Sequence, residues 1–468
     1  MIDRAMARVA ALFVLAFLAL AARQAYVQIV QAPSLSARAD DPRHALTDAQ
    51  RGRILATDGT VLAQTRNGKR IYPYGASLAH TLGYVSARYG TSGLEDAYDR
   101  ALTPPQGSGD PIAQFQALLS AFGAGHGDAR GADVVTTIVP AIQAELYAQL
   151  DRHVRAAGVV LDPNTGAVLA IASVPSFDPN TLDVNFSSLL SDPNSPLLDR
   201  ALDGLYPPGS TFKIFTASAA VDSGTVAMDS RFHDPGYLDV GTFRLHNDED
   251  EYTGDADLTT AFALSSNVDF AQIALKLGVD TFYQYLDRWN IGGSLDFQIP
   301  ASRARVPDRN GLTDGELAQM GFGQGALLMT PLQMALIDAT IAGGGNEPRP
   351  FIVRQIVRQG AISSVDAPGI LTNPISADTA TDVKNMMVAV VARGTGFPAR
   401  IPGIVVAGKT GTATNPLGAS HSWFVCFAPA GKPRVAVAIV VENAGYGASV
   451  AAPIARDVLE TALQNVGT

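Results

Sequence analysis

The chain has 468 residues, a mass of 49.0 kDa, a hydrophobic content of 47% and a formal net charge of -10. This length allows one large and one smaller domain with buried cores, whereas the negative charge argues against a nucleic-acid partner, which needs clustered positive side chains. The one cysteine, Cys426, excludes an intrachain disulfide and a cysteine-based metal cluster, and we expect it to be a small core residue on a strand.

Residues 1–30 have the pattern of a cytoplasmic tip followed by a transmembrane anchor. Two arginines precede an apolar stretch over 9–22, which continues beyond Arg23. A full span needs about 20 apolar residues, and Arg23 can lengthen this one by reaching the membrane surface. The charge before the span predicts a single-pass protein of the cell membrane with its main body outside the cytoplasm. A cleaved signal peptide is the alternative, because Ala-Leu-Ala at 19–21 resembles a cleavage site.

Residues 31–130 are predicted to form a small N-terminal domain. Two short segments at 51–56 and 60–63 are separated by an Asp-Gly turn, which is typical of a hairpin. A helix is predicted at 93–102. Glycine- and proline-rich sequence follows and places the domain boundary near residue 131.

The large domain, 131–468, is predicted to be an antiparallel sheet flanked by helices, an α+β fold. Its first strands should pair with strands near its end, and a hairpin is expected around the turn at 162–166. The predicted elements are strands at 133–138, 158–161, 167–173, 404–407, 422–427 and 434–441, and helices at 140–154 and 450–463.

The tetrad at 210–213, Ser-Thr-Phe-Lys, is the first of three motifs with catalytic residue types. A Pro-Pro-Gly run precedes it, so Ser210 should stand at the beginning of a helix that reaches about residue 222. Positions i and i+3 share one helix face, so Lys213 could approach Ser210 and act as its base. That role needs a lowered lysine pKa, which burial or the charge of Lys409 could provide. Alone, the tetrad also fits a helix N-cap followed by a solvated lysine.

The triplet at 265–267, Ser-Ser-Asn, interrupts a helical pattern over 258–277. One interpretation is a helix break or a cap between two shorter helices, because these residue types are poor helix formers. In the functional interpretation, Ser265 passes protons between Lys213 and a leaving group, while Asn267 orients the substrate and Lys213.

The third motif, Lys-Thr-Gly-Thr at 409–412, follows an apolar run and is predicted to lie on an edge strand. An extended peptide could pair with that edge as an added strand. Lys409, Thr410 and Thr412 could then bind a carboxylate, Gly411 would allow close approach of the backbone, and the amides of Ser210 and Thr412 could form an oxyanion hole. Alone, the motif also fits a β-turn.

No metal site is predicted. Acidic residues over 248–257 do not have the spacing of an EF-hand loop and are interpreted as a solvated loop. His246 and His421 have no partners at ligand spacing.

The three motifs occur once each, in the order found in serine β-lactamases and penicillin-binding proteins. Together with further matching segments, they make the chain similar to class B penicillin-binding proteins, in particular the short penicillin-binding protein A group. The matching segments are Arg-Gly-Arg-Ile at 51–54, Gly-Leu-Glu at 93–95, Leu-Asp-Pro-Asn-Thr-Gly at 161–166, Tyr-Pro-Pro-Gly at 206–209, Gly-Phe-Gly-Gln-Gly at 321–325, Thr-Pro-Leu-Gln-Met-Ala at 330–335 and Arg-Gly-Thr-Gly at 393–396.

The resemblance implies a peptidoglycan D,D-transpeptidase that cross-links stem peptides through an acyl-enzyme on Ser210 and that β-lactams inhibit. It implies no metal or organic cofactor, and a membrane glycan polymerase as a possible partner. The chain departs from the family in its short N-terminal domain and at Thr414, where the family often has Glu or Gln. Partner contacts and side-chain preference are therefore not transferred.

Other functions share the motifs. A D,D-carboxypeptidase differs only in using water to resolve the acyl-enzyme. A β-lactamase would be smaller and needs a group that activates water, for which the sequence has no class A-like pattern. A non-catalytic β-lactam receptor would need a cytoplasmic signalling segment, and only a few residues precede the expected anchor. A catalytically idle scaffold would have no need for Ser210 together with both lysines.

Overall fold

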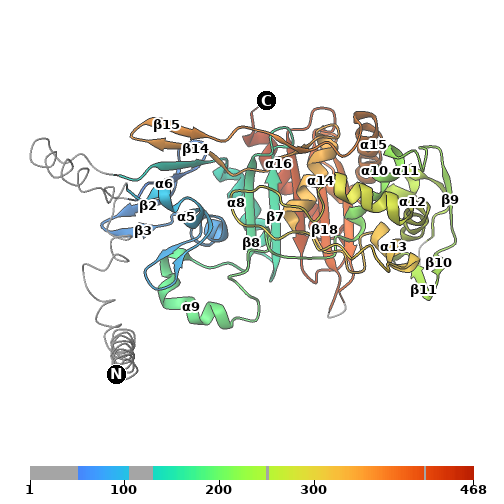
Figure 1. The fold of residues 1–468 in the computed structure, drawn as a ribbon, viewed down its shortest axis with the longest axis horizontal. Helices are drawn as coiled ribbons and strands as arrows, with labels where there is room; N and C mark the ends of the chain where they lie inside the picture. The colour runs from blue at the N-terminus through green and yellow to red at the C-terminus, as the bar shows by residue number, and fades with distance from the viewer. Residues whose placement is uncertain (1–50, 105–129, 249–251, 416–417, 468) are drawn as a thin grey trace, which may run out of the picture.

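The computed structural model describes residues 51–104, 130–248, 252–415 and 418–467. Two sheets lie one after the other along the long axis of the molecule, and a helical region follows the second sheet (Figure 1). No helix within these ranges is long and apolar enough to cross a membrane. The anchor predicted at 1–30 falls outside the described residues.

The central sheet has five antiparallel strands in the order β17-β18-β19-β7-β8. Their bounds are β7 (Ala156–Leu161), β8 (Val168–Val174), β17 (Ala407–Ala413), β18 (His421–Ala428) and β19 (Val435–Val441). The first strands of the large domain thus pair with its last strands through β7 and β19, which confirms that prediction. Cys426 lies buried on β18, as expected.

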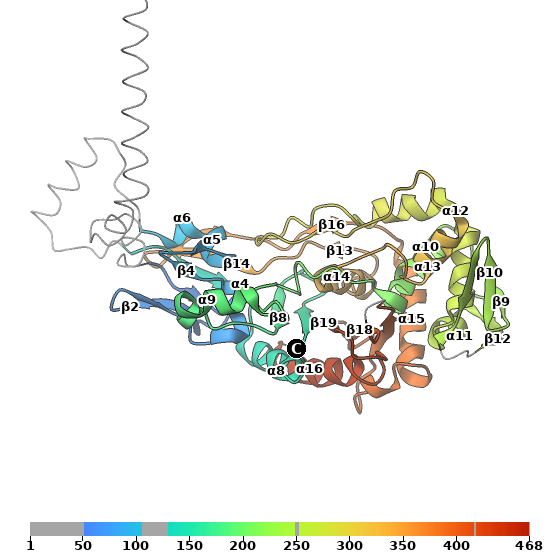
Figure 2. The same cartoon turned by 90° about the horizontal axis from the view of Figure 1, so that it is seen from below.

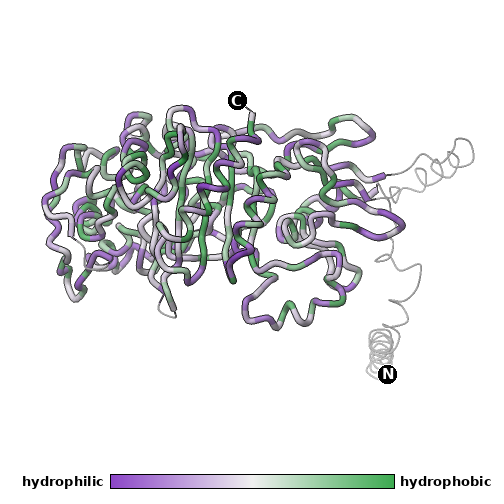
Figure 3. The backbone as a smooth tube through the Cα atoms, turned by 180° about the vertical axis from the view of Figure 1, so that it is seen from behind, coloured by the Kyte–Doolittle hydropathy of each residue, from purple (hydrophilic) through white to green (hydrophobic). Residues whose placement is uncertain are grey.

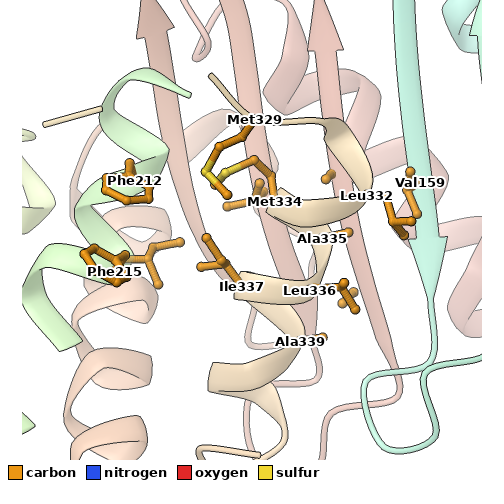
Figure 4. Packing of buried hydrophobic residues seen from close by; sticks show 14 of the residues in the cluster. Val159, Phe212, Phe215, Met329, Leu332, Met334, Ala335, Leu336, Ile337 and Ala339 are labelled. Atoms are coloured by element: carbon orange, nitrogen blue, oxygen red, sulfur yellow. The ribbon is translucent and has the colours of Figure 1, made fainter. Parts of the chain in front are cut away.

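Helices cover both faces of this sheet. The helices α8 (Pro140–Leu150) and α16 (Ala451–Asn465) lie on one face, and α14 (Pro331–Ala342) lies on the other (Figure 2). Because both faces are covered, β19 is an uninterrupted apolar run with every residue buried, and the strands are mostly hydrophobic in Figure 3. On α14, Leu332 points toward β7 and Ile337 toward the helix that follows Ser210 (Figure 4).

The helical region stands beyond the edge strand β17. It contains η4 (Gly209–Phe212), α10 (Lys213–Asp222), α11 (Leu258–Ala263), α12 (Asn267–Arg288), α13 (Asp314–Gly321) and α15 (Ala377–Arg393). Two hairpin-like pairs are attached to it: β9 (Arg231–Asp234) with β12 (Gly254–Asp257), and β10 (Tyr237–Val240) with β11 (Phe243–His246). The edge position of β17 beside this region agrees with the prediction for the third motif.

The N-terminal sheet has the order β15-β14-β6-β1-β2-β3. The predicted hairpin is present as β1 (Ile54–Leu55) and β2 (Val61–Arg66), joined at Asp58 and Gly59. Its other strands are β3 (Lys69–Ile71), β6 (Asp133–Thr136), β14 (Val353–Arg358) and β15 (Ala361–Val365). The sheet therefore uses chain on both sides of residue 131, and the division at that residue stays a prediction.

Short elements connect these layers. The predicted helix at 93–102 is two helices, α5 (Gly93–Ala97) and α6 (Asp99–Leu102), because Tyr98 leaves the helical conformation. The others are η2 (Gly75–Leu78), α4 (Ala79–Leu82), β4 (Val85–Ser86), β5 (Gly90–Thr91), η3 (Pro179–Thr181), α9 (Leu182–Ser191), β13 (Glu347–Pro348), β16 (Ile370–Thr372) and η6 (Phe397–Ala399).

The strand predicted at 404–407 is wrong in its bounds. Ile404 is held in a bridge with Ile401, and β17 begins only at Ala407. The Lys-Thr-Gly motif is consequently part of the strand rather than a segment that follows it. Val405 is 56% exposed, which shows that the apolar run before the motif is not a buried strand.

One buried carboxyl in the core predicts a pH-dependent stability. Asp338 on α14 is fully buried, and neither of its oxygens has a hydrogen-bond partner among the described residues. Burial raises the pKa of Asp338 well above its usual range, so the folded protein keeps the proton while the unfolded chain loses it above about pH 3.9. The contribution of Asp338 to stability therefore falls as pH rises.

We expect Asp338→Asn to stabilise the protein, and the gain to grow as pH rises above about pH 3.9, by up to about 1.4 kcal/mol per pH unit while the folded carboxyl keeps its proton. Urea unfolding of both proteins at about pH 5 and about pH 7 measures this difference. An equal gain at both would mean that the folded carboxyl is ionised.

Candidate active site

Ser210 lies in a tight turn at the beginning of α10, not in its first helical turn. The 3-10 helix η4 contains Ser210, and α10 begins at Lys213. Gly209 has a φ of +55°, and a side chain there would meet the Thr412 carbonyl at 2.8 Å. Glycine at 209 therefore permits the close approach that brings Ser210 beside β17. The sequence predicted that the helix begins at Ser210, whereas the short 3-10 helix η4 holds Ser210 and α10 begins three residues later.

Lys213 is fully buried, and its ammonium group faces the second motif. Lys213 Nζ donates hydrogen bonds to the Ser265 carbonyl at 2.6 Å, to Asn267 Oδ1 at 2.8 Å and to Ser265 Oγ at 3.2 Å. Burial lowers the pKa of Lys213 to about 7, against the opposing charges of nearby carboxylates. Burial, and not the charge of Lys409, is therefore the main cause of the lowered pKa.

Ser265 and Asn267 stand where the helical pattern breaks. Helix α11 ends at Ala263 and α12 begins at Asn267, while Ser265 has a left-handed φ of +66°. Ser266 is the N-cap of α12, because its hydroxyl accepts a hydrogen bond from the Asp269 amide at 2.9 Å. The break turns Ser265 and Asn267 toward Lys213. The two interpretations of the triplet thus describe one structure, in which the break forms the site.

Lys409 meets Ser265 from the other side. Lys409 is fully buried on β17, and its Nζ donates to Ser265 Oγ at 2.8 Å and to the Thr410 carbonyl at 3.2 Å. Its pKa is well below the usual value because of burial and the neighbouring charge of Lys213. The hydroxyl of Ser265 therefore connects the two lysines, which come from motifs far apart in the sequence.

Gly411 and the two threonines complete the edge strand. A side chain at Gly411 would lie 2.9 Å from both Thr211 Cγ2 and Trp423 Cβ, so only glycine fits there. Thr410 Oγ1 lies 2.5 Å from Thr395 Oγ1, and the two share a hydrogen bond. Thr395 is a residue that the motif analysis did not select. Its signal was the Arg-Gly-Thr-Gly run at 393–396.

These groups open onto one cavity of about 790 Å³. Its walls include residues from all three motifs, namely Ser210, Ser265, Thr410 and Thr412. Within the described ranges, Ser210 makes no hydrogen bond with Lys213, which is common in enzymes without substrate because catalytic contacts tighten on binding. A serine beside a cavity, backed by a lysine of lowered pKa, can serve as a nucleophile with a base.

The site holds no evident metal centre. The part of the chain that the structure describes has no group of three or more His, Cys, Asp or Glu residues able to hold a metal ion. His421 accepts a hydrogen bond from the Asn443 amide, and burial lowers its pKa.

The sequence matches two protein-family models. Residues 156–460 match the penicillin binding protein transpeptidase domain. Residues 51–124 match the penicillin binding protein A dimerisation domain. Together these matches include the central sheet, the candidate site and every strand of the N-terminal sheet except β6.

Curated relatives and solved structures agree with these models. Peptidoglycan D,D-transpeptidase PbpA of Mycolicibacterium smegmatis is 33% identical, and the alignment covers 98% of each chain. Peptidoglycan D,D-transpeptidase MrdA of Haemophilus influenzae is 30% identical over 84% of this chain and 69% of its own. The structure of penicillin-binding protein A from M. tuberculosis, a ceftriaxone acyl-enzyme complex, is 31% identical with a TM-score of 0.82 and covers 90% of this chain and 100% of that one.

The fold is therefore that of penicillin-binding transpeptidase domains, with the central sheet and its helices as the common core. The family model alone extends over more than half of the sequence. The chain belongs to the penicillin-binding protein family, and within it to the class B proteins.

Proposed function

We propose that this protein is a peptidoglycan D,D-transpeptidase in which Ser210 is the nucleophile and Lys213 its base. The observation that carries the proposal is the continuous path from Lys213 through the Ser265 hydroxyl to Lys409, next to Ser210 in one cavity. A buried lysine with a pKa of about 7 is partly neutral at neutral pH and can accept a proton. The relatives named D,D-transpeptidases support the same activity.

The reaction has two halves. Ser210 Oγ attacks the carbonyl of the penultimate D-alanine of a stem peptide, the peptide bond to the terminal D-alanine breaks, and an ester to Ser210 remains. An amine of a second stem peptide then attacks that ester and releases Ser210. Ser265 passes the proton from Lys213 to the leaving amine in the first half, while Asn267 orients Lys213. β-Lactams would acylate the same Ser210.

The edge strand β17 is the proposed substrate platform. An extended stem peptide would add to it as a further strand. Lys409, Thr410 and Thr412 would bind the terminal carboxylate, and Gly411 leaves space for the peptide. The backbone amides of Ser210 and Thr412 would stabilise the oxyanion, an effect worth on the order of 10²–10³ in rate.

Location and partners follow from the same proposal. An anchor at 1–30 would hold the enzyme in the cell membrane, single-pass, with residues 31–130 and 131–468 outside the cytoplasm. A membrane glycan polymerase would supply the glycan strands on which the enzyme acts. The proposed chemistry requires neither a metal nor an organic cofactor.

A time course of labelling by fluorescent penicillin, combined with analysis of products from a stem pentapeptide, tests the function. A transpeptidase should keep the label, release D-alanine and form a cross-linked product when an amine is added. Release of D-alanine without any cross-link would favour a D,D-carboxypeptidase. Rapid loss of label as hydrolysed drug would mean a β-lactamase, and no label on the folded protein would indicate a receptor or scaffold without catalysis.

The lowered pKa of Lys213 predicts the pH dependence of acylation. Only the neutral amine accepts a proton, so the second-order rate constant for penicillin should rise with pH and level off above about pH 7. Stopped-flow labelling between about pH 5 and about pH 9 measures this profile. A rate constant that does not change across this range would exclude Lys213 as the titrating base.

A further inference from the structure

Asp248 is an acidic residue in the cavity that none of the three motifs includes. It lines the same cavity as Ser210 and Ser265, and its side chain is exposed. Asn267 Nδ2 lies 3.5 Å from Asp248 Oδ1, a long contact that leaves the carboxylate available to a ligand. Asp248 therefore belongs to the wall of the cavity that carries Asn267, and not to the substrate platform on β17.

The position of Asp248 is fixed by its chain neighbour. Asn247 Oδ1 accepts hydrogen bonds from the Asn267 amide at 2.7 Å and the Val268 amide at 3.1 Å. Asn247 Nδ2 donates to Asp234 Oδ2 at 2.7 Å, and Asp234 is fully buried. Residue 247 is thus attached to the beginning of α12, which holds the next residue at the mouth of the site.

The charge of Asp248 acts on both catalytic lysines. Burial lowers the pKa of Lys213 and of Lys409, and in each case the negative charge of Asp248 opposes that effect. The carboxylate is thus close to the groups that move the proton. A positively charged ligand bound to Asp248 would stand beside Ser265 and the ester on Ser210.

We propose that Asp248 binds the ammonium group of the acceptor amine and so selects a cationic primary amine as the second substrate. This inference rests on the proposed transpeptidase function. The amine that leaves in the first half departs on the side of Ser265 and Asn267. By microscopic reversibility, the incoming amine arrives there too. Asp248 is the described carboxylate in the wall of the cavity on that side.

The second half of the reaction balances with the acceptor arriving as an ammonium ion, the form that a carboxylate binds. The acceptor reaches the site as an ammonium ion and must lose one proton to Lys213, through Ser265, before its nitrogen can attack. The carbon–nitrogen bond then forms, the bond from that carbon to Ser210 Oγ breaks, and Ser210 Oγ takes a second proton from the amine. The products are an amide with one hydrogen on nitrogen, free Ser210 and one proton released to solvent.

The test measures the ratio of aminolysis to hydrolysis, that is, how much of the acyl-enzyme reacts with an added nucleophile and how much reacts with water. A thioester of an acylated D-alanine forms the acyl-enzyme, and two nucleophiles are compared at neutral pH: glycinamide, which is largely protonated, and hydroxylamine, which is largely neutral. For Asp248→Asn, we expect the ratio of aminolysis to hydrolysis with glycinamide to fall about fivefold, the size expected of an ion pair near the surface. The ratio with hydroxylamine should not fall.

Asp239→Asn is the matched control. Asp239 is on β10, is exposed and pairs with Arg244 at 2.6 Å, so this variant makes the same charge change outside the cavity and should not change either ratio. Asp248→Glu should recover most of the glycinamide ratio because it keeps the carboxylate.

Three results would overturn the inference. An equal fall for both nucleophiles would assign Asp248 to the tuning of the lysines alone, and an unchanged glycinamide ratio would show that the carboxylate does not bind the acceptor. If wild-type protein forms the acyl-enzyme but transfers it to neither nucleophile, the proposed transpeptidase function fails, and this inference fails with it. The supporting result is a ratio of aminolysis to hydrolysis that falls in Asp248→Asn for glycinamide alone and that Asp248→Glu restores.

Discussion

Ser210→Ala should abolish covalent labelling by penicillin, because it removes the hydroxyl that we propose as the nucleophile. Ser210 is at the narrow approach between η4 and β17, where Gly209 meets Thr412. Lys213 and Lys409 remain in the variant, so drug binding without a covalent bond can continue. Intact-protein mass spectrometry after incubation with penicillin measures the adduct, and peptide mapping of the wild type should place it on Ser210.

Ser223→Ala is the control for this variant. It makes the same change just after the other end of α10, at an exposed serine, and should label as the wild type does. A stable adduct on Ser210→Ala would contradict the assignment. Ser265 would then be the first residue to map, since it also lines the cavity and contacts both lysines.

The residue types of the site could be read from the sequence, but the geometry of their contacts could not. Lys213 donates to the Ser265 hydroxyl and to Asn267, as the functional interpretation of the triplet expected, and also to the Ser265 carbonyl, which the sequence did not indicate. That arrangement depends on the left-handed backbone at Ser265. A helical pattern over 258–277 contains no local signal that fixes the direction of the break, because it results from packing against α10.

In the fold, too, features with local sequence signals were predicted and features that depend on distant contacts were not. The Asp58 turn and the hairpin around 162–166 have strong local turn chemistry and were predicted correctly. In contrast, the strand predicted at 404–407 has the wrong bounds, because Ile404 pairs back with Ile401 and β17 begins only at Ala407. The return of β14 to the N-terminal sheet was not predicted. Its partner β6 lies more than two hundred residues earlier in the chain.

Asp248 was missed for a related reason. In the sequence it begins an acidic stretch that has no metal-ligand spacing, and such stretches are usually solvated surface. Its proximity to the site comes from Asn247, whose amide side chain joins Asp234 to the beginning of α12. These contacts connect residues 13 to 21 positions apart in the chain. No local pattern indicates them.

The second large effect concerns the N-terminal sheet. Glu95 is fully buried between two arginines: Arg51 Nε lies 2.7 Å from Glu95 Oε2, and Arg70 Nε lies 2.6 Å from Glu95 Oε1. Glu95→Gln would leave two buried guanidinium groups facing a neutral amide. Breaking a buried ion pair in this way costs about 3–5 kcal/mol. We therefore expect this part of the protein to open far more often in the variant.

Hydrogen exchange measures the opening of the N-terminal sheet independently of the transpeptidase part. Amides of β1, β2 and β3 should exchange about 10²- to 10⁴-fold faster in Glu95→Gln, as that cost implies. Both tryptophans, Trp289 and Trp423, lie in the transpeptidase part, so their fluorescence reports on that part during urea unfolding. Asp96→Asn is the control: Asp96 is the exposed neighbour of Glu95 and should alter stability by less than about 0.5 kcal/mol. Unchanged exchange in Glu95→Gln would contradict the prediction.

A triple variant distinguishes the cost of an unpaired charge from the net value of the network. Arg51→Met, Glu95→Leu and Arg70→Met together remove the three buried charges, and they leave the exposed carboxylate of Asp99 without its partner Arg51. Well-packed apolar side chains often replace a buried ion triad with no loss of stability. Arg51 also donates to the Glu95 carbonyl at 2.6 Å, and Arg70 to the Gly52 carbonyl at 2.8 Å, so these backbone oxygens would lose partners. If the triple variant stays destabilised, the hydrogen bonds to these backbone oxygens, and not the buried charges, attach the segment at 51–52 to α5 and to β3.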